Sequence, residues 1–262
     1  MLLVVVTLAA FVLVPFLFWR GTWFGRPLPD RHLEQYLGDD AKPRHIQHAL
    51  VQISSRLERR DPAVQRWYPR IAAIGRHPVT ELRVTAAWLM GQDNRSPVFH
   101  DALAGMLQDA EPLVRRNAAL ALARFNDPQG RPELRAMLQS FALRSPRVGV
   151  LRYRLTVGEV VNPGTLLARL EAGGAEPLEI RSPLPGKLER KIALEGARVS
   201  GNEEILAIAP SPDHVWEALR GLYLVGTAED LRHVERFTRL VREWPEKITQ
   251  QAQLTAQQIR SR

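Results

Sequence analysis

The sequence contains no cysteine. Disulfide bonds, thiolate nucleophiles and cysteine-ligated zinc or iron–sulfur centres are therefore excluded. The patterns GxxxxGK[ST], GxGxxG, HExxH and GxSxG are also missing, so the chain lacks the signatures of phosphate-binding loops, dinucleotide-binding folds, zinc proteases and serine hydrolases. We assign no catalytic residue and expect a protein that is not an enzyme.

Lysine is scarce as well. The chain has four lysines in 262 residues, although its formal net charge at pH 7 is +8, so arginine carries the positive charge. The basic residues are spread along the chain, and aromatic residues do not interleave with them. This distribution is typical of a solvated surface, and we expect no nucleic acid partner. With 45% hydrophobic and 24% charged residues, the chain is globular and long enough for two domains.

Charged residues are absent from the first 19 positions, MLLVVVTLAAFVLVPFLFW, which is close to the ~20 residues needed to cross a bilayer. Trp19 and Trp23 stand where interfacial aromatic residues belong. No charged segment precedes the apolar run and no small-residue cleavage site follows it, which argues against a cleaved signal peptide. We therefore expect a transmembrane anchor over residues 1–24, with residues 1–19 in the membrane.

The orientation of this anchor follows from the charges beside it. Arg20, Arg26 and Arg31 lie on its C-terminal side, and only the terminal amine lies on the other side. The positive-inside rule then predicts a single-pass inner-membrane protein whose soluble part is cytoplasmic.

Helical periodicity begins after a linker over residues 25–43 that is rich in glycine, proline and aspartate. Apolar residues spaced four, three and four apart share one helix face: Ile46, Leu50, Ile53 and Leu57. Two later segments align under a constant shift that carries Thr80 onto Pro112: TELRVTAAWLMG (80–91) and PLVRRNAALALA (112–123). Three pairs match under this shift: Arg83 and Arg115, Ala86 and Ala118, Ala87 and Ala119. A two-helix repeat with this spacing predicts an α-solenoid.

These segments resemble HEAT repeats, especially the short bacterial kind known from phycobilisome lyases. The repeat pattern of that family is an acidic residue, proline, valine-arginine and paired alanines, and it is present in the segment QDAEPLVRRNAALALARF. The resemblance covers residues 60–142 and implies HEAT-like repeats over 44–142. It implies a structural role for Arg115, paired with an acidic group such as Asp109. Chromophore handling is not inferred, because a shared scaffold does not transfer activity.

The helical pattern stops near residue 142. Residues 147–210 contain short runs of valine, leucine and isoleucine between glycine, proline and asparagine turns, which predicts a small all-β barrel or sandwich. Helical sequence resumes over 213–245 and supplies the missing partner helices, so we expect the β-module to be inserted into the solenoid. Residues 246–262 are polar and glutamine-rich, and we expect a C-terminal tail with a frayed or partner-stabilised helix.

The β-segment contains an internal duplication. VGEVVNPGTLLARL recurs as EGARVSGNEEILAIA, and one shift carries both Gly158 onto Gly196 and Val161 onto Val199. The segment resembles the biotinyl/lipoyl domain, a flattened barrel-sandwich of two quasi-symmetric halves, and the related domain of membrane-fusion adaptor proteins. The resemblance implies a hairpin that carries a modified lysine.

That lysine is missing. The hairpin of biotin carriers reads Glu-Ala-Met-Lys-Met, whereas here Gly173 and Gly174 stand at the corresponding turn. A carrier arm needs a primary amine at this tip, and Lys187 and Lys191 belong to the strand that opens the second half. We therefore expect no biotin, no lipoate and no other cofactor.

Other candidate ligands are weak. His45 and His48 lie three apart on a helix, but no third ligand stands at a suitable spacing, so we expect a solvent-exposed pair and no metal site. Trp67, Trp88 and Trp216 have helical surroundings and are expected to pack in the core.

The sequence thus favours a mainly α protein with an all-β insert. We expect a membrane-anchored scaffold or accessory subunit that binds proteins, namely subunits of a membrane complex, and no small-molecule substrate. Two alternatives stay open: a membrane-fusion-type adaptor of an export system, and a biotin or lipoate carrier subunit. Such adaptors usually carry a long helical hairpin between the two halves of the sandwich, whereas only the short loop 172–179 stands there.

Overall fold

A computed structural model describes residue 11 and residues 27–171, 176–239 and 244–262. The membrane anchor expected over 1–24 lies outside these residues apart from position 11, as do Gly173 and Gly174. None of the helices in the described ranges is long and apolar enough to span a bilayer. The described part is mainly α-helical, and a separate antiparallel β region is inserted between two of its helices.

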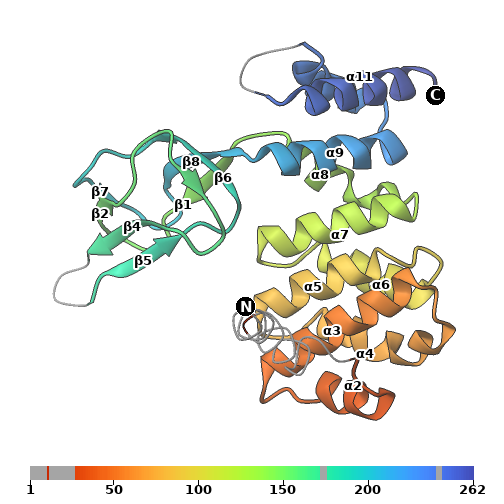
Figure 1. Ribbon diagram of the computed structural model, residues 1–262. Helices are drawn as coiled ribbons and strands as arrows, with labels where there is room; N and C mark the ends of the chain where they lie inside the picture. The colour runs from red at the N-terminus through yellow and green to blue at the C-terminus, as the bar shows by residue number, and fades with distance from the viewer. Residues whose placement is uncertain (1–10, 12–26, 172–175, 240–243) are drawn as a thin grey trace, which may run out of the picture.

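The helices stack in two layers (Figure 1). The first layer, called here the odd layer, consists of the longer helices: α3 (Pro43–Glu58), α5 (Thr80–Met90), α7 (Pro112–Arg124), α9 (Pro212–Val225) and α11 (Glu246–Arg260). The second layer alternates with it in the chain: α4 (Tyr68–Ile74), α6 (Pro97–Met106), α8 (Arg131–Met137) and α10 (Leu231–Val234). Helix α2 (Asp30–Leu37) packs on α3, and 3₁₀ turns join other elements: η1 (Pro62–Trp67), η2 (Pro128–Gly130), η3 (Ala228–Asp230) and η4 (Glu235–Phe237).

The spacing of apolar residues explains the helices and their packing. The face of α3 predicted from the sequence is buried at Ile46, Leu50 and Ile53. Small residues allow successive helices to approach closely: a Cβ added at Gly91 would lie 2.8 Å from Cβ of Ala121. Close packing of this kind needs small residues such as Gly91 and Ala121 at the contact between the helices.

The repeat arginines form equivalent contacts in successive repeats. Arg83 Nη1 donates to the carbonyl of His77 at 2.9 Å, and Arg115 Nη1 donates to that of Asp109 at 2.8 Å. Their acidic partners differ from the expected pairing of Arg115 with Asp109. The Asp109 carboxylate binds Arg83 through two hydrogen bonds of 2.7 and 2.9 Å, whereas Arg115 binds Glu133 at 3.2 Å. That expectation was wrong in its partner, because each arginine reaches the acid of the following repeat.

The helices on either side of the β region share one core. Apolar residues of α7, α8, α9 and α11 form a single buried cluster. Gly221 of α9 lies against Leu134 of α8, and a Cβ there would lie 3.0 Å from Leu134 Cδ1. Arg131 before the β region binds Asp230 after it, with Nε 3.0 Å from Oδ2. The solenoid therefore continues across the insertion.

The last helix differs from the tail expected over 246–262. Helix α11 packs against α9 and buries Ile248, Ala252, Ala256 and Ile259. Thr255 Oγ1 donates to the Leu219 carbonyl at 2.9 Å. The glutamines occupy the other faces of the helix, so the segment looks polar in sequence although one face belongs to the core.

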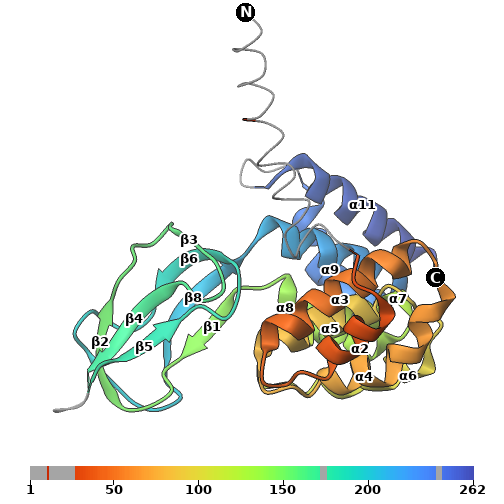
Figure 2. The same ribbon diagram turned by 60° about the horizontal axis from the view of Figure 1, so that its bottom comes forward.

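The β-module contains these strands in the described residues: β1 (Phe141–Arg144), β2 (Gly149–Tyr153), β3 (Val160–Val161), β4 (Leu166–Glu171), β5 (Leu178–Arg181), β6 (Gly186–Lys191), β7 (Arg198–Val199) and β8 (Glu204–Pro210). They form two antiparallel sheets with the orders β1-β8-β6-β3 and β5-β4-β2-β7. Before the module, helix α8 ends at Met137, and residues expected to finish the solenoid form β1 instead, because Phe141 to Arg144 pair with β8. Figure 2 shows the module beside the helices, connected to them through β1 and β8.

The sequence duplication is visible in the backbone. The two sheets have equivalent strand orders. If each strand of one half is exchanged with the corresponding strand of the other half (β1 with β5, β2 with β6, β3 with β7, β4 with β8), one sheet order becomes the other. The Gly164 amide donates to the Ser182 carbonyl at 2.8 Å, and the Asn202 amide donates to that of Ser145 at 2.7 Å. Gly164 and Asn202, which match under the shift of the duplication, both have positive φ, +85° and +66°. The module therefore has pseudo-twofold symmetry.

Candidate protein-interaction surface

The histidine and acidic side chains of the described residues do not gather into a metal site. Within the described residues, no group of three or more histidine, aspartate or glutamate side chains could hold a metal ion. The expectation of a solvent-exposed histidine pair was wrong. His48 is 8% exposed, and His45 stacks on Tyr36 with its Nδ1 2.7 Å from Asp39 Oδ2. Both imidazoles are part of the packing between α2 and α3.

The lysines of the β-module lie where the sequence predicts. Lys187 and Lys191 are both in β6, away from the hairpin that joins β4 to β5. The Lys191 ammonium lies 4.6 Å from the ring centroid of Tyr153, a cation–π contact within the module. Figure 1 places the facing ends of β4 and β5 on the side of the module that is remote from the helices.

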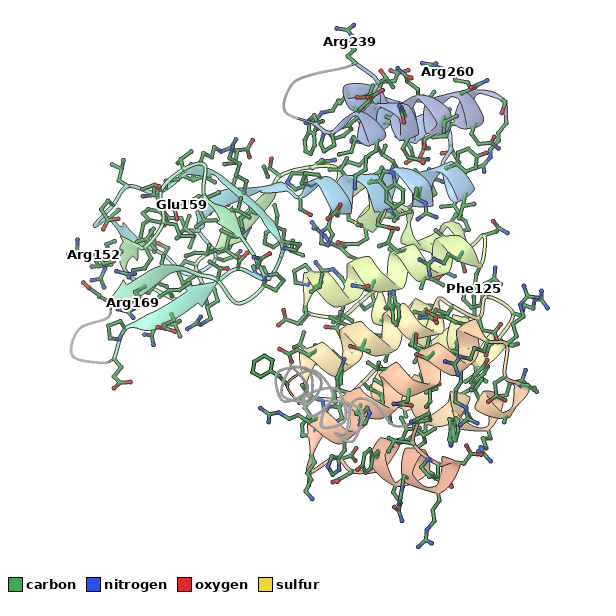
Figure 3. The ribbon with its side chains drawn as sticks, in the orientation of Figure 1. Phe125, Arg152, Glu159, Arg169, Arg239 and Arg260 are labelled. Atoms are coloured by element: carbon green, nitrogen blue, oxygen red, sulfur yellow. The ribbon has the colours of Figure 1, made fainter. Side chains whose placement is uncertain are left out.

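Ion pairs lie on the outer face of the β-module. Figure 3 shows Arg152 and Arg169 on the side that faces away from the helices. Arg152 pairs with Glu171 at 3.4 Å, and Arg169 pairs with Glu179 at 3.3 Å. Exposed pairs of this kind contribute little to stability.

The tryptophans divide into two groups. Trp67 is buried, and Trp216 is half-buried against the C-terminal core, as expected. Trp88 was expected in the core but is 44% exposed. Its neighbours Ala87 and Leu89 take the buried positions of α5, so helical geometry turns the indole outward.

Trp88 lines a shallow groove across the odd layer. Two adjoining hollows, one extending from α3 to α9 and the other from α7 to α11, share Arg124, Arg220 and Leu224. We define the odd-layer groove by one or two residues from each helix that it crosses after α3: Trp88, Leu120, Arg124, Arg220, Leu224 and Leu254. Leu224 and Leu254 are 39% and 54% exposed.

The centre of the groove is basic. Arg124 Nη1 donates to the Gly91 carbonyl at 3.3 Å, and in the part of the chain that the structure describes no carboxylate forms an ion pair with it. Arg220 pairs with Glu217 at 3.5 Å and lies over the ring of Trp216, 4.5 Å from its centroid. Arg124 therefore keeps most of its donors available.

The composition of this groove is that of a protein-binding surface. Tryptophan, tyrosine and arginine carry a large share of binding energy in interfaces, and Tyr223 adds a further exposed aromatic ring beside Leu224. The groove could not be predicted from the sequence, because its residues come from segments far apart in the chain, from Trp88 to Leu254. The one available signal was an aromatic residue at an outward position of a repeat helix.

Comparison with known families supports part of the resemblance described above. Residues 69–145 match the family of HEAT repeats. The match runs from α4 to β1 and confirms the HEAT-repeat part of the resemblance. HEAT repeats commonly mediate protein–protein interactions, which agrees with the expectation of protein partners. The search of curated proteins finds no match to the chain.

Proposed function

We propose that the protein is a membrane-anchored, non-enzymatic scaffold or accessory subunit that binds subunits of a membrane complex. The observation that carries the proposal is the odd-layer groove, an exposed surface of aromatic, aliphatic and arginine side chains on a stack of HEAT-like helices. Solenoid repeats present extended surfaces of this kind to protein partners.

Residues 1–19 supply the anchor in this proposal, because their apolar length suits a bilayer. The soluble part lies on the cytoplasmic side, in keeping with the arginines that follow the apolar run. An anchor of this kind confines the scaffold to the surface where its partners are embedded.

The β-module acts in this proposal as an unmodified lipoyl-like unit. Its support is the pseudo-twofold pair of four-stranded sheets together with the sequence Gly173-Gly174 at the turn where a carrier has its lysine. The module offers a compact surface projected from the solenoid and carries no covalent group.

A tagged chain recovered from membranes in mild detergent tests this function. We expect stoichiometric co-purification of membrane proteins and an intact mass equal to that of the unmodified sequence. Recovery of the chain alone would contradict the scaffold function. A mass excess equal to biotin or lipoate would instead support the carrier alternative.

A further inference from the structure

The groove repeats one feature from helix to helix. Each successive odd-layer helix from α5 to α11 presents a large apolar side chain to it: Trp88, Leu120, Leu224 and Leu254. Helix α9 adds the ring of Tyr223 beside Leu224. Trp88, Leu224 and Leu254 are exposed and Leu120 is half-buried. The groove therefore offers a row of apolar contacts with one step per helix.

The length of that step matches two turns of an α-helix. Packed helices lie about 8–10 Å apart, and seven residues of an α-helix advance about 10.5 Å. A helix laid across the odd layer would thus present the same face to each successive groove helix at nearly every seventh residue. Three such steps need about 20 residues.

The charge of the groove indicates the charge of a helix that would bind there. The residues common to both hollows include Arg124 and Arg220, at the centre of the row, whereas Glu58 and Glu217 each line only one hollow. Arg124 forms no ion pair with a described carboxylate. A carboxylate on the same face as the apolar residues, midway along the occupant, would meet these guanidinium groups.

We propose that the odd-layer groove binds an acidic amphipathic helix of about 20 residues, with apolar anchors near every seventh position and carboxylates facing Arg124 and Arg220. A helix fits better than an extended peptide, because the groove is built from helices and offers no sheet edge for strand pairing among the described residues that line it. This inference rests on the proposed scaffold function and specifies the partner of that site.

A designed peptide tests the chemistry directly. The probe is a fluorescently labelled, alanine-based helix of about 22 residues, with leucine at every seventh position and two glutamates on the same face between the central leucines. It is titrated by anisotropy against the full chain in mild detergent. We expect saturable binding that weakens when the glutamates are replaced by lysines or when the leucines are moved off register.

Charge reversal on the protein provides the complementary arm. R124E combined with R220E should weaken binding of the acidic peptide by roughly tenfold and should favour the lysine version in its place. R76E is the control for R124E alone, because both change the net charge by two. Arg76 is exposed on a hollow between α4 and α6, so R76E should leave binding unchanged. Absence of saturable binding, equal affinity for both peptides, or an equal loss with R76E would overturn the proposal.

The same variants separate this inference from the function on which it rests. If membrane partners stay bound to the R124E/R220E chain in the detergent pull-down, the scaffold function stands and the groove proposal is wrong. If the unaltered chain retains no partner, the scaffold function fails independently of the peptide result.

Discussion

Single residues determine whether the solenoid continues across the inserted module. Asp230 is fully buried and accepts hydrogen bonds from Arg131 Nε at 3.0 Å and from the Thr227 amide at 2.8 Å. Arg135 Nε lies 3.5 Å from its second carboxylate oxygen. The carboxylate thus joins α8, before the β-module, to the turn after α9.

Replacing this carboxylate should destabilise the protein strongly. Asp230→Ala leaves the guanidinium of Arg131 without its buried partner, so we expect a loss of about 3 kcal/mol in the free energy of unfolding. Glu229→Ala is the matched control. Glu229 binds the same Arg131 at 3.3 Å but is 77% exposed, so its loss should cost less than about 0.5 kcal/mol. Urea unfolding measures both, and equal effects would argue against the role of Asp230.

A histidine near the base of the β-module should make stability depend on pH. Burial, and secondarily the Arg116 guanidinium, lower the pKa of His214 to about 4. The His214 Nδ1 lies 3.1 Å from Arg116 Nη1. Because the unfolded chain protonates this imidazole near its ordinary pKa of about 6.5, the folded state loses stability as pH falls from there towards 4, by at most about 3 kcal/mol.

His214→Gln should remove this part of the pH dependence. The difference in unfolding free energy between the two chains should change between pH 6.5 and 4 and be constant above that range. Arg116→Met should raise the pKa of His214, which an imidazole titration by nuclear magnetic resonance would detect. An unchanged pKa in that variant would show that Arg116 does not contribute.

Residue type alone could not distinguish the exposed tryptophan from the buried ones. Trp67 and Trp88 both stand in helical segments, and only the packing of the neighbouring repeats determines which indole faces the core. The pairing of Asp109 with Arg83 could not be predicted from the sequence either, because it connects two repeats. Long-range contacts decide both positions.

At the scale of elements, α11 combines a core face with a groove face. Ile259 is buried and lies near Gly226, where an added Cβ would be 2.8 Å from Ile259 Cδ1. Leu254 on the same helix lines the groove and is 54% exposed. One helix therefore serves both stability and the proposed binding.

Two alanine variants of α11 should separate these roles. Ile259→Ala should lower the free energy of unfolding by about 2–4 kcal/mol, because it leaves a cavity in the shared core. Leu254→Ala should change it by less than about 0.5 kcal/mol and should weaken binding of the acidic peptide instead. Thermal or urea unfolding together with the anisotropy titration makes the comparison. A large stability loss in Leu254→Ala would contradict the assignment of its exposed face.

The periodicity of apolar residues predicted most helices but did not reveal the buried face of α11 or the strand β1. The apolar spacing of α3 and the repeated paired alanines of α5 and α7 were sufficient, because these patterns are strong over several turns. A frayed or partner-stabilised helix was expected over 246–262, and the packing of α11 into the core was missed because glutamine covers its exposed faces and alanine contributes to its core face. Strand β1 is short and begins soon after α8 ends, so the sequence pattern did not separate it from the helical array.

At the scale of the whole molecule, the helical and β parts have separate cores. The β-module buries its own cluster, which includes Leu170 and Leu188, and the C-terminal helices bury another. The chain connects the two parts through α8–β1 and β8–α9. The insertion and the internal duplication were both predictable, because each left a clear change or repeat in the sequence pattern.

Separate cores predict separable unfolding. Leu188→Ala should destabilise the β-module by about 2–4 kcal/mol while the helical array keeps its stability. Hydrogen exchange resolved by residue should show faster exchange in β6 and β8 and unchanged exchange in α7 and α9. A uniform acceleration across helices and strands would mean that the molecule unfolds as one unit.

The most direct test of the proposed scaffold is the detergent pull-down from membranes, carried out in parallel with the unaltered chain, R76E and the R124E/R220E variant. We predict that the unaltered chain and R76E retain the same membrane partner in stoichiometric amount and that R124E/R220E loses it. Retention of no partner by the unaltered chain would contradict the proposed scaffold function, and retention by R124E/R220E would contradict the assignment of binding to the odd-layer groove.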